Sequence, residues 1–464
     1  MTENDLMALT PLDGRYTETT EPLRAFFSEF SYIRGRARLE IAYLISLSQD
    51  AKLIRPLTQG ELDLLHNLSD NFSLNDAQEI KTLEGTTRHD VKAIENYLRT
   101  RLERTSLADS VPWLHFGLTS EDLNLTAQAI SLRDARDEVI LPALDKVIAQ
   151  LADFARRYKS TPMLARTHGQ PAVPTTFGKE VAFFVARLTK QREKLAGHTF
   201  ESKWSGAVGN YNAMVAALPE VDWPTFSENF LRGLVLEPAQ ASTQLIPYEN
   251  WLEYFQTLQL TNGILLDLCQ DMWRYISDNY LKLHVVSDEV GSSTMPQKVN
   301  PIDFENAEGN LGLANALFES YIRKLPVSRL QRDLSDSTVR RSFGESLGHT
   351  LVAWTSITRG LERVEANEAG MRSELEAHWE VVAEGAQTIL RVANISSAYD
   401  QLKSLTRGKE ITQESYLEWV DELDIDEAVK SKLQSLSPLT YVGLAEEIAE
   451  QVLNHREHGA HGDS

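Results

Sequence analysis

Three histidines, His89, His115 and His168, are the residues of this sequence best suited to acid–base chemistry. Histidine carries a proton near neutral pH more readily than any other side chain, although a single histidine is more often structural. His168 lies in the polar segment RTHGQPAVP (166–174), which we expect to be a loop stiffened by its prolines. His89 lies one or two residues inside an expected helix, and the apolar surroundings of His115 favour a place in the core or behind a site.

A further stretch with reactive residue types is GSSTMPQKVNP, residues 291–301. It is too polar for a core strand and too rich in Gly, Ser and Pro for a helix. Asn300 can cap a helix, Pro301 suits the first helical position, and Asp303 follows three residues after the cap. We therefore expect a mobile loop that ends on a rigid helix beginning around Pro301.

The segment KLPVSRLQRDLSDSTVRR (324–341) could bind an anion because it is rich in arginine. Its hydroxyl residues Ser337 and Thr338 adjoin two arginines where we expect a helix to begin. Backbone N–H groups, hydroxyl groups and guanidinium groups together suit a phosphate. For an isolated segment, a solvated charged face is the alternative interpretation.

Three more polar segments stand where helices are expected to start: PLDGRY (11–16), TTRHD (86–90) and GLTSED (117–122). Each segment alone is typical of a loop that caps a helix, and Thr119 with Asp122 makes a good capping pair. For any one of them, capping and function are about equally good interpretations.

Signatures of a metal or cofactor site are missing from the sequence. It has no HExxH, no paired cysteines, no close spacing of histidine and carboxylate ligands, no P-loop and no GxSxG elbow. The late histidines of the tail HREHGAHGDS (455–464) are more typical of a solvated tail than of a metal site. We therefore expect acid–base chemistry that uses no cofactor and no metal.

Composition narrows the range of partners. The formal net charge of −21 argues against broad binding to nucleic acid or to anionic membranes, but it allows a small anionic ligand at a local cluster of Arg and Lys. No apolar stretch approaches the length of about 18 residues that a membrane span needs, and the first residues, MTENDLMALT, do not resemble a secretory signal. The single cysteine, Cys269, lies in an apolar helical segment, so we expect a cytoplasmic protein with a buried, inert thiol.

Long helices are the elements expected to position these polar segments. Apolar residues recur at three- and four-residue steps over 141–158, and similar patterns cover 176–196, 249–284, 302–322 and 338–366. Helices of this length with broad apolar stripes usually bury one another in a bundle, often across subunits. Pro142 marks either a helix start or a kink.

We expect three domains along the chain. Residues 1–115 hold shorter helices and loops, residues 116–365 hold the long-helix bundle, and residues 366–464 return to shorter helices. The tail HREHGAHGDS is polar and is expected to be disordered. Few strands are expected, because alternating runs joined by Asn-Gly or Asp-Gly turns are absent.

The segment GSSTMPQKVNP resembles the signature loop of the fumarase/aspartase superfamily, GSSxMPxKxNP. PLDGRY, TTRHDVKAIE, GLTSEDLN, RTHGQPAVPTTFGKE and SDSTVRR together resemble the adenylosuccinate lyase family within it, most closely its long bacterial form. The resemblance runs from about residue 8 to residue 450, in the family's order. Gln297 stands where many members carry His or Tyr, at a position that the signature leaves variable.

This resemblance implies an all-α, three-domain fold whose central long helices form the core of a homotetramer, with each active site drawing loops from three subunits. It implies cofactor-free elimination of fumarate from adenylosuccinate, which gives AMP. It also implies the same elimination from succinyl-aminoimidazole-carboxamide ribotide, earlier in purine biosynthesis. The expected partners are therefore small purine nucleotides and further copies of this chain.

The resemblance also implies individual roles. Ser292 matches the general base that removes the Cβ proton, and His168 matches the general acid that protonates the leaving nitrogen; the sequence alone leaves Ser293 open as the base. The positions that match substrate-binding residues of the family are Arg15, Tyr16, Arg88, His89, Asp90, Thr119, Ser120, Gln244, Ser293, Lys298, Asn300, Asn306, Arg332, Ser337, Thr338, Val339, Arg340 and Arg341. Of these, the run from 337 to 341 best suits phosphate.

The implied chemistry is physically reasonable for these residue types. Removing a proton beside a carboxylate creates a dianion, which the nearby Lys298 and Asn300 would stabilise. A serine becomes a base only when its alkoxide is stabilised and water is excluded, and a closing loop can provide both conditions.

Two alternatives remain from the sequence. Sister lyases that act on argininosuccinate, fumarate or aspartate share the signature loop but have no use for a phosphate-binding segment. A non-catalytic helical scaffold is the other alternative, since some superfamily members are structural proteins. The presence of both the expected acid and the expected base argues against a scaffold.

Overall fold

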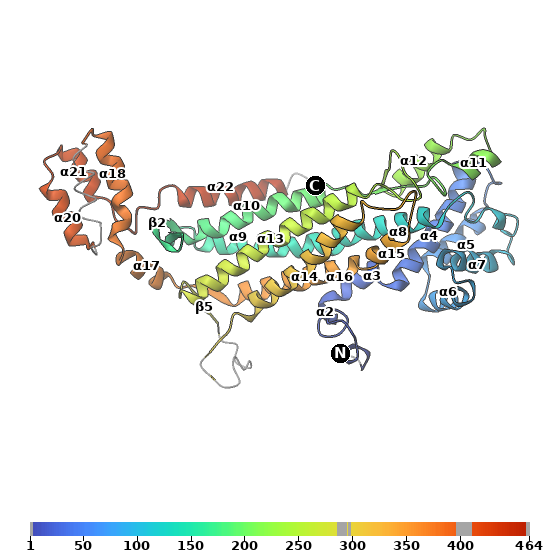
Figure 1. Ribbon diagram of the computed structural model, residues 1–464, viewed down its shortest axis with the longest axis horizontal. Helices are drawn as coiled ribbons and strands as arrows, with labels where there is room; N and C mark the ends of the chain where they lie inside the picture. The colour runs from blue at the N-terminus through green and yellow to red at the C-terminus, as the bar shows by residue number, and fades with distance from the viewer. Residues whose placement is uncertain (1–2, 285–294, 296–297, 396–410, 461–464) are drawn as a thin grey trace. The chain divides into compact units, whose positions relative to one another are not determined.

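The computed structural model describes residues 3–284, 295, 298–395 and 411–460 (Figure 1). Helices dominate these residues, and the strands among them form three two-stranded sheets. The expected all-α class is therefore confirmed. Within the same described ranges, no helix combines the length and the apolar character that crossing a bilayer requires.

The chain folds into two compact units. The first unit holds residues 1–143, 192–262 and 310–353, and the second holds residues 144–191, 263–309 and 354–464. Residues 1–115 thus fall wholly in the first unit and residues 366–464 wholly in the second, whereas the central range is divided. The division into three domains stays a prediction.

Five long helices follow the apolar periodicity of the sequence, and each contributes residues to both units. Their bounds are α9 Leu141–Arg157, α10 Phe177–Ala196, α13 Glu249–Ser277, α14 Ile302–Lys324 and α16 Phe343–Glu362. α13 ends earlier than the pattern over 249–284 predicts, because residues 281–283 form a strand. α14 begins at Ile302, in agreement with a helix expected to begin around Pro301, and the carbonyl of Pro301 accepts the first helical hydrogen bond, from Phe304.

The stretch that leads into α9 changes its helix type. Helix α8 (Ser120–Ala135) is followed by the π-helical residues Arg136–Ile140, and α9 begins directly after them. Pro142 has no backbone N–H, so the regular pattern of α-helical hydrogen bonds cannot continue through it. A π-helical turn accommodates such a local irregularity. The break expected at Pro142 is therefore a change of helix type just before the proline.

In the first unit, helices α4 to α7 enclose a hydrophobic core that contains Leu44, Leu65, Ile94 and Leu98 (Figure 1). Hydroxyl residues cap the starts of α4, α5 and α6, which fixes where these helices begin. α4 is as long as the central helices. It is an exception to the shorter helices that were expected over residues 1–115. The remaining elements of this unit are α1 Glu3–Leu6, α2 Thr17–Thr20, a 3-10 turn Glu21–Leu23, α3 Arg24–Phe27, α4 Glu29–Gln49, α5 Gln59–Asp70, α6 Leu74–Thr87, α7 Asp90–Leu102, a 3-10 turn Val111–Trp113, β3 Glu201–Ser202, α11 Asn212–Ala217, α12 Trp223–Gly233, β4 Glu237–Pro238 and α15 Ser335–Arg340.

Aromatic residues join three of the long helices inside the first unit. The ring of Phe255, on α13, lies 5.6 Å from that of Phe318 and 5.3 Å from that of Tyr321, both on α14. It also lies 4.8 Å from the ring of Phe343, the first residue of α16. Buried aromatic pairs of this kind add to the energy of apolar burial, so they fix these helices as a rigid support.

In the second unit, α18, α20 and α21 pack around Leu390, Tyr416, Val420 and Leu433 (Figure 1). Cys269 is buried in α13, and burial raises the pKa of its thiol, as expected for an inert cysteine. The remaining elements of this unit are β1 Pro162–Thr167, β2 Gln170–Thr176, β5 Leu281–Leu283, β6 Val364–Ala366, α17 Glu368–Glu376, a 3-10 turn Trp379–Val382, α18 Ala383–Val392, α20 Gln413–Glu422, α21 Glu427–Gln434 and α22 Ala445–Ala460.

The C-terminal tail departs from the expectation. Helix α22 continues through Ala460, so the first part of HREHGAHGDS is helical and only residues 461–464 lie outside the described residues. Once a helix has formed, each added residue gains a backbone hydrogen bond at little further cost. A polar segment can therefore extend an amphipathic helix such as α22.

Candidate active site

A polar array in the first unit starts at the N-terminus of α8. The amide of Gln244 donates to the hydroxyl of Thr119 at 3.3 Å, and the carbonyl oxygen of Gln244 accepts from the guanidinium of Arg332 at 3.0 Å. All three residues are half-buried. The structure therefore brings together three of the predicted substrate-binding residues, from segments that are far apart in the sequence.

Behind this array lies Glu121, whose side chain is 0% exposed. Its Oε1 atom contacts the guanidinium of Arg332 at 2.7 Å, and its Oε2 atom accepts from the guanidinium of Arg340 at 2.7 Å. Asn124 donates to Oε1 at 2.8 Å. A buried carboxylate is stable only when it is paired and hydrogen-bonded, and Glu121 meets both conditions.

Arg340 is buried, and each of its guanidinium nitrogens has a partner. Asp336 accepts from Nε at 3.0 Å, Glu121 accepts from one terminal nitrogen, and Gln128 accepts from the other. Burial by itself lowers the pKa of Arg340, but the surrounding Tyr248, Glu121 and Asp336 side chains raise it well above its ordinary value. The guanidinium of Arg340 is thus held inside the protein.

The predicted phosphate-binding run begins inside α15, and its last residue, Arg341, follows the end of that helix. Ser337 and Thr338 occupy the third and fourth positions of this short helix, because Asp333 accepts a hydrogen bond from the backbone N–H of Ser335 at 2.8 Å and starts the helix earlier than expected. Val339 is half-buried. Arg341 is exposed, and its guanidinium lies 3.3 Å from the carboxylate of Glu29.

A buried ion pair between Asp122 and Lys203 fixes the start of α8. The carboxylate of Asp122 accepts from the ammonium of Lys203 at 2.6 Å and from the backbone N–H of Thr119 at 2.8 Å. It also accepts from the backbone N–H groups of Ser205 and Gly206, at 3.0 and 3.2 Å. This confirms the expected capping pair of Thr119 and Asp122, and it holds the next residue, Ser120, at the first helical position.

The segment TTRHD joins α6 to α7. Arg88 follows the last residue of α6 and ends the helix with a positive φ of 53°. His89 is exposed. His89 precedes α7 as its cap, since its Nδ1 atom accepts from the backbone N–H of Lys92 at 3.2 Å, so the expectation that it lies inside the helix is wrong by one or two residues. A cap residue leaves the helical conformation and turns its side chain back onto the first turn.

Asp90, the first residue of α7, is held by a buried arginine. The guanidinium of Arg36, on α4, donates to Asp90 at 2.6 Å and to the side-chain oxygen of Asn124 at 3.4 Å. Burial opposes ionisation of Asp90, but Arg36 keeps the pKa of this carboxyl below its ordinary value. Because Asn124 also donates to Glu121, one continuous chain of hydrogen bonds links α7, α4, α8 and Arg332.

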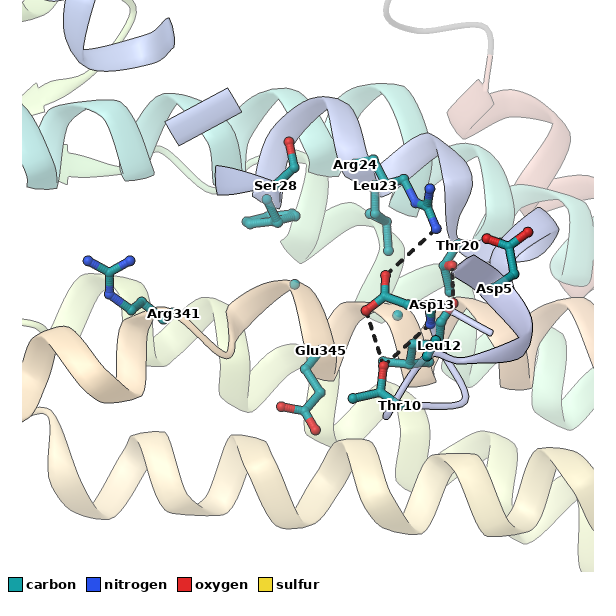
Figure 2. A pocket seen from close by; sticks show the side chains of 14 residues that line it. Asp5, Thr10, Leu12, Asp13, Thr20, Leu23, Arg24, Ser28, Arg341 and Glu345 are labelled. Atoms are coloured by element: carbon teal, nitrogen blue, oxygen red, sulfur yellow. Dashed lines mark hydrogen bonds and ion pairs between the residues drawn. The ribbon is translucent and has the colours of Figure 1, made fainter. Parts of the chain in front are cut away.

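A cleft of about 590 Å³ opens beside the N-terminal segment of the first unit (Figure 2). Asp13 lies in it, where its carboxylate accepts from the hydroxyl of Thr10 at 3.1 Å and stands 3.7 Å from the guanidinium of Arg24. Arg341 lines the same cleft, apart from this pair. Two of the predicted residues, Arg15, which is exposed, and Tyr16, which is half-buried, follow Asp13 after one intervening glycine.

His168 lies in the second unit, at the tip of a β-hairpin. Strands β1 and β2 pair antiparallel, with Thr167 opposite Gln170, so His168 and Gly169 form a two-residue turn with φ of 53° and 74°. Turns with two positive φ values match the twist of a hairpin. The loop expected over 166–174 is therefore a hairpin turn, and its histidine is exposed.

The remaining candidates belong to the second unit or lie outside the described residues. Lys298 is exposed, Asn300 is half-buried, and the side-chain oxygen of Asn306 on α14 accepts from Ser356 at 2.9 Å. Ser292 and Ser293 lie outside the described residues. Across the part of the chain that the structure describes, no group of three His, Cys, Asp or Glu side chains is arranged to hold a metal ion.

Three charged residues that organise the site were missed from the sequence: Arg36, Glu121 and Lys203. Each has a side chain that is at most 1% exposed. The only sequence signal for Arg36 is a charged residue among apolar positions of an expected helix. Glu121 lies in the polar segment GLTSED, but the sequence does not indicate its partners or those of Lys203, because they become neighbours only in the folded chain.

His115 is a half-buried residue next to this site. Its Nδ1 atom lies 2.6 Å from the carboxylate of the buried Glu40, and its backbone N–H donates to the same carboxylate at 3.0 Å. Burial by itself lowers the pKa of His115, but the pairing with Glu40 outweighs it and raises the pKa. A place in the core or behind the site, as the sequence favoured, agrees with these contacts.

Comparison with known families and proteins covers almost the whole chain. A family model described as "Lyase" matches residues 14–315, and a model described as "Adenylosuccinate lyase C-terminal" matches residues 328–442. The adenylosuccinate lyase of Haemophilus influenzae is 44% identical over 450 residues, which cover 96% of this chain and 99% of that protein. The adenylosuccinate lyase of Legionella pneumophila strain Corby is 43% identical, with 97% and 99% covered.

The fold has its own counterpart among solved structures. The crystal structure of a fumarate lyase from Mesorhizobium sp. BNC1 aligns with a TM-score of 0.73 over 94% of this chain and 97% of that chain, at 18% sequence identity. At this identity the likeness concerns the fold alone. It confirms the expected helical fold of the fumarase/aspartase superfamily.

Proposed function

Since the chain belongs to the adenylosuccinate lyase family, we propose that this carbon–nitrogen lyase eliminates fumarate from adenylosuccinate to give AMP. We extend the proposal to the same elimination from succinyl-aminoimidazole-carboxamide ribotide, which gives the carboxamide ribotide. The substrates are small purine nucleotides of nucleotide biosynthesis, the location is the cytoplasm, and no metal or other cofactor takes part.

The linked array of Thr119, Gln244 and Arg332 is the observation that carries this proposal. The three residues come from separate segments that the family resemblance places at the substrate, and the structure joins them by hydrogen bonds. A guanidinium, an amide and a hydroxyl in one half-buried place suit an anionic, polar substrate. An accidental cluster of surface residues would not be backed by buried partners such as Glu121 and Asp122.

In the proposed reaction, Ser292 takes the proton from Cβ of the succinyl group. The electron pair of that C–H bond forms the new double bond of fumarate, and the bond between Cα and nitrogen breaks. His168 then gives its proton to the departing nitrogen, so no negative charge is left on that nitrogen. A histidine suits this step because its pKa lies near neutral pH.

The proposed binding groups divide between the two ends of the substrate. Thr119, Ser120, Ser293, Lys298 and Asn300 surround the succinyl carboxylates, where they stabilise the dianion that forms when the proton leaves. The phosphate lies against the run 337–341. Because Arg340 is enclosed, Arg341 supplies the guanidinium of that run that solvent can reach. Its exposed ion pair with Glu29 is weak, so a phosphate can replace Glu29 as the partner of Arg341.

The other positions that we propose to contact the nucleotide are exposed or half-buried in the free chain. They are Arg15, Tyr16, Arg88, His89, Asp90, Gln244, Asn306 and Arg332. Asp90 is the carboxylate among these residues, and a carboxylate would repel phosphate. We therefore assign Asp90 to a hydroxyl or amino group of the nucleotide.

We propose that the active form is a homotetramer whose sites are shared between subunits. Leu260 on α13 and Leu313 on α14 support an interface, because their exposed fractions, 51% and 54%, are high for leucine on central helices. Sedimentation should show a tetramer at working concentrations. A stable and active monomer would contradict shared sites.

A direct assay tests the function. Purified protein is incubated with adenylosuccinate, and AMP and fumarate are followed by chromatography and absorbance. We expect stoichiometric formation of both products, and likewise of the carboxamide ribotide and fumarate from the second substrate. Failure to turn over either nucleotide, together with cleavage of argininosuccinate, would assign the chain to a sister activity.

The choice of base is tested separately. Ser292→Ala should lower kcat by roughly 10²–10⁴, the usual contribution of a general base, whereas Ser293→Ala should mainly raise KM. The opposite pattern would make Ser293 the base. Circular dichroism of both variants checks that the helical fold is intact.

A further inference from the structure

Arg332 and Arg340 share one buried carboxylate but differ in what else they bind. Every guanidinium nitrogen of Arg340 has a partner, and its side chain is 1% exposed. Arg332 is 19% exposed, and its Nε–H is a buried donor for which the described residues supply no acceptor. A donor in that condition costs free energy unless a ligand satisfies it. Arg332 is therefore the arginine of the pair that has bonding capacity left for a ligand.

Glu121 is the group that determines where this guanidinium lies. Arginine has many rotatable bonds, so a guanidinium held only by Gln244 would sample several positions and lose entropy on binding. The 2.7 Å contact from Oε1 of Glu121 to a terminal nitrogen of Arg332 removes much of that freedom before the ligand arrives. Glu121 is itself fixed by Arg340 and Asn124, at 2.7 and 2.8 Å.

We propose that Glu121 is a positioning residue for substrate binding, which acts through Arg332 and does not touch the substrate. Its carboxylate holds Arg332 with the Nε–H directed to an anionic or carbonyl oxygen of the nucleotide. Gln244 accepts a hydrogen bond from Arg332 and donates one to Thr119, so the position of Arg332 also restrains Thr119. This inference rests on the proposed function, because it assigns Arg332 to the substrate of that reaction.

A neighbouring carboxylate provides the matched control. Asp336 is also buried and also pairs with Arg340, at 2.8 Å, but its other hydrogen bond comes from the hydroxyl of Tyr248 and not from Arg332. Glu121→Gln and Asp336→Asn therefore remove the same kind of charge beside the same arginine. Only Glu121→Gln releases Arg332.

The test is a double-mutant cycle on turnover of adenylosuccinate. We expect Glu121→Gln to lower kcat/KM by about ten- to hundredfold, mainly through KM, because a hydrogen bond to a charged group is lost. In an Arg332→Gln background the same substitution should change kcat/KM by less than about threefold. Asp336→Asn should have the same effect in both backgrounds.

The outcomes separate the two proposals. If the wild-type protein turns over adenylosuccinate but Glu121→Gln has the same effect with and without Arg332, the positioning role is wrong and the function stands. If the wild-type protein does not turn over adenylosuccinate, the function fails and this role fails with it. Should Glu121→Gln not fold, Glu121→Asp keeps the charge but withdraws it by one methylene, and the same cycle with that variant decides.

Discussion

The polar array of the first unit and the hairpin of the second place their functional residues in opposite ways. Thr119, Gln244 and Arg332 rest on buried charges, of which Glu121 and Asp122 are fully enclosed. His168 is exposed, and it lies in a two-residue turn in which both φ values are positive. In the proposed reaction, binding groups are thus fixed in advance, whereas the acid depends on its surroundings in the complete site.

The two regions also differ in how they handle buried charge. In the first unit, each carboxylate of the array faces a guanidinium or an ammonium group. In the second unit, the side chain of Asp271 on α13 is near other carboxylates, those of Asp267 and Glu180. Partial burial and these neighbours raise the pKa of Asp271 to about 6. At Asp271 the neighbouring carboxylates therefore disfavour the charged form, although Arg187, which pairs with Asp267 at 2.6 Å, opposes this effect.

The largest expected effect would sharpen this contrast at the hairpin. His168→Ala should lower kcat by roughly 10²–10⁴, because the leaving nitrogen loses its proton donor. The free energy of unfolding should change by less than about 0.5 kcal/mol, since the side chain is exposed. Steady-state kinetics and urea unfolding measure both. His284→Ala, at another exposed histidine of the same unit, is the control, and equal loss of rate in both variants would remove the acid role.

The next effect concerns the array. Arg36→Met should lower the free energy of unfolding by about 3 kcal/mol, because it leaves Asp90 without its buried partner. Arg38, on the same helix, is exposed, so Arg38→Met should cost less than about 0.5 kcal/mol. Urea unfolding at one protein concentration compares the two variants. Equal costs would mean that the buried ion pairs do not stabilise this region.

A smaller effect tests the turn. Gly169 has φ of 74° and open space around the position of a Cβ atom, so Gly169→Ala should cost about 1–2 kcal/mol from backbone strain alone. Gly60, in the first turn of α5, also has open space but no positive φ, and Gly60→Ala should stabilise the chain slightly. Thermal unfolding gives both signs. A neutral Gly169→Ala would show that the turn does not constrain His168.

The smallest effect probes the like charges of the second unit. The pKa of Asp271 is higher in the folded chain than in the unfolded chain, so its stabilising contribution is complete below about pH 4 and is lost as the pH rises through 6. Asp271→Asn should therefore increase the free energy of unfolding at pH 8, by about 1 kcal/mol after allowance for solvent screening. At pH 5 the increase should be smaller. A gain that does not vary with pH would contradict the raised pKa.

Local patterns made the helices predictable. The bounds of α9, α10 and α14 follow the apolar steps of the sequence within a few residues, because helix formation and one-sided burial leave the same periodicity. The cap of α8 was equally accessible, since Thr119 and Asp122 are three residues apart. These features depend on contacts within a few residues of one another.

Contacts between distant residues could not be predicted in the same way. Arg340 and Glu121 are far apart in the sequence, and no local sequence pattern around either residue indicates its partner. The hairpin has the sequence pattern of a loop, because its turn is His-Gly and because Pro171 and Pro174 stand in β2. Proline is tolerated there because each strand of a two-stranded ribbon has a free edge.

The enclosed thiol of Cys269 has a practical consequence for observing the hairpin. The thiolate is the form that reacts with alkylating dyes, and burial keeps this cysteine, the only one in the chain, in the protonated form. A cysteine introduced at the exposed Gln170, beside His168, would therefore take up a fluorophore selectively. Emission from that label would report in real time whether the imidazole passes from water into a drier environment when nucleotide is added.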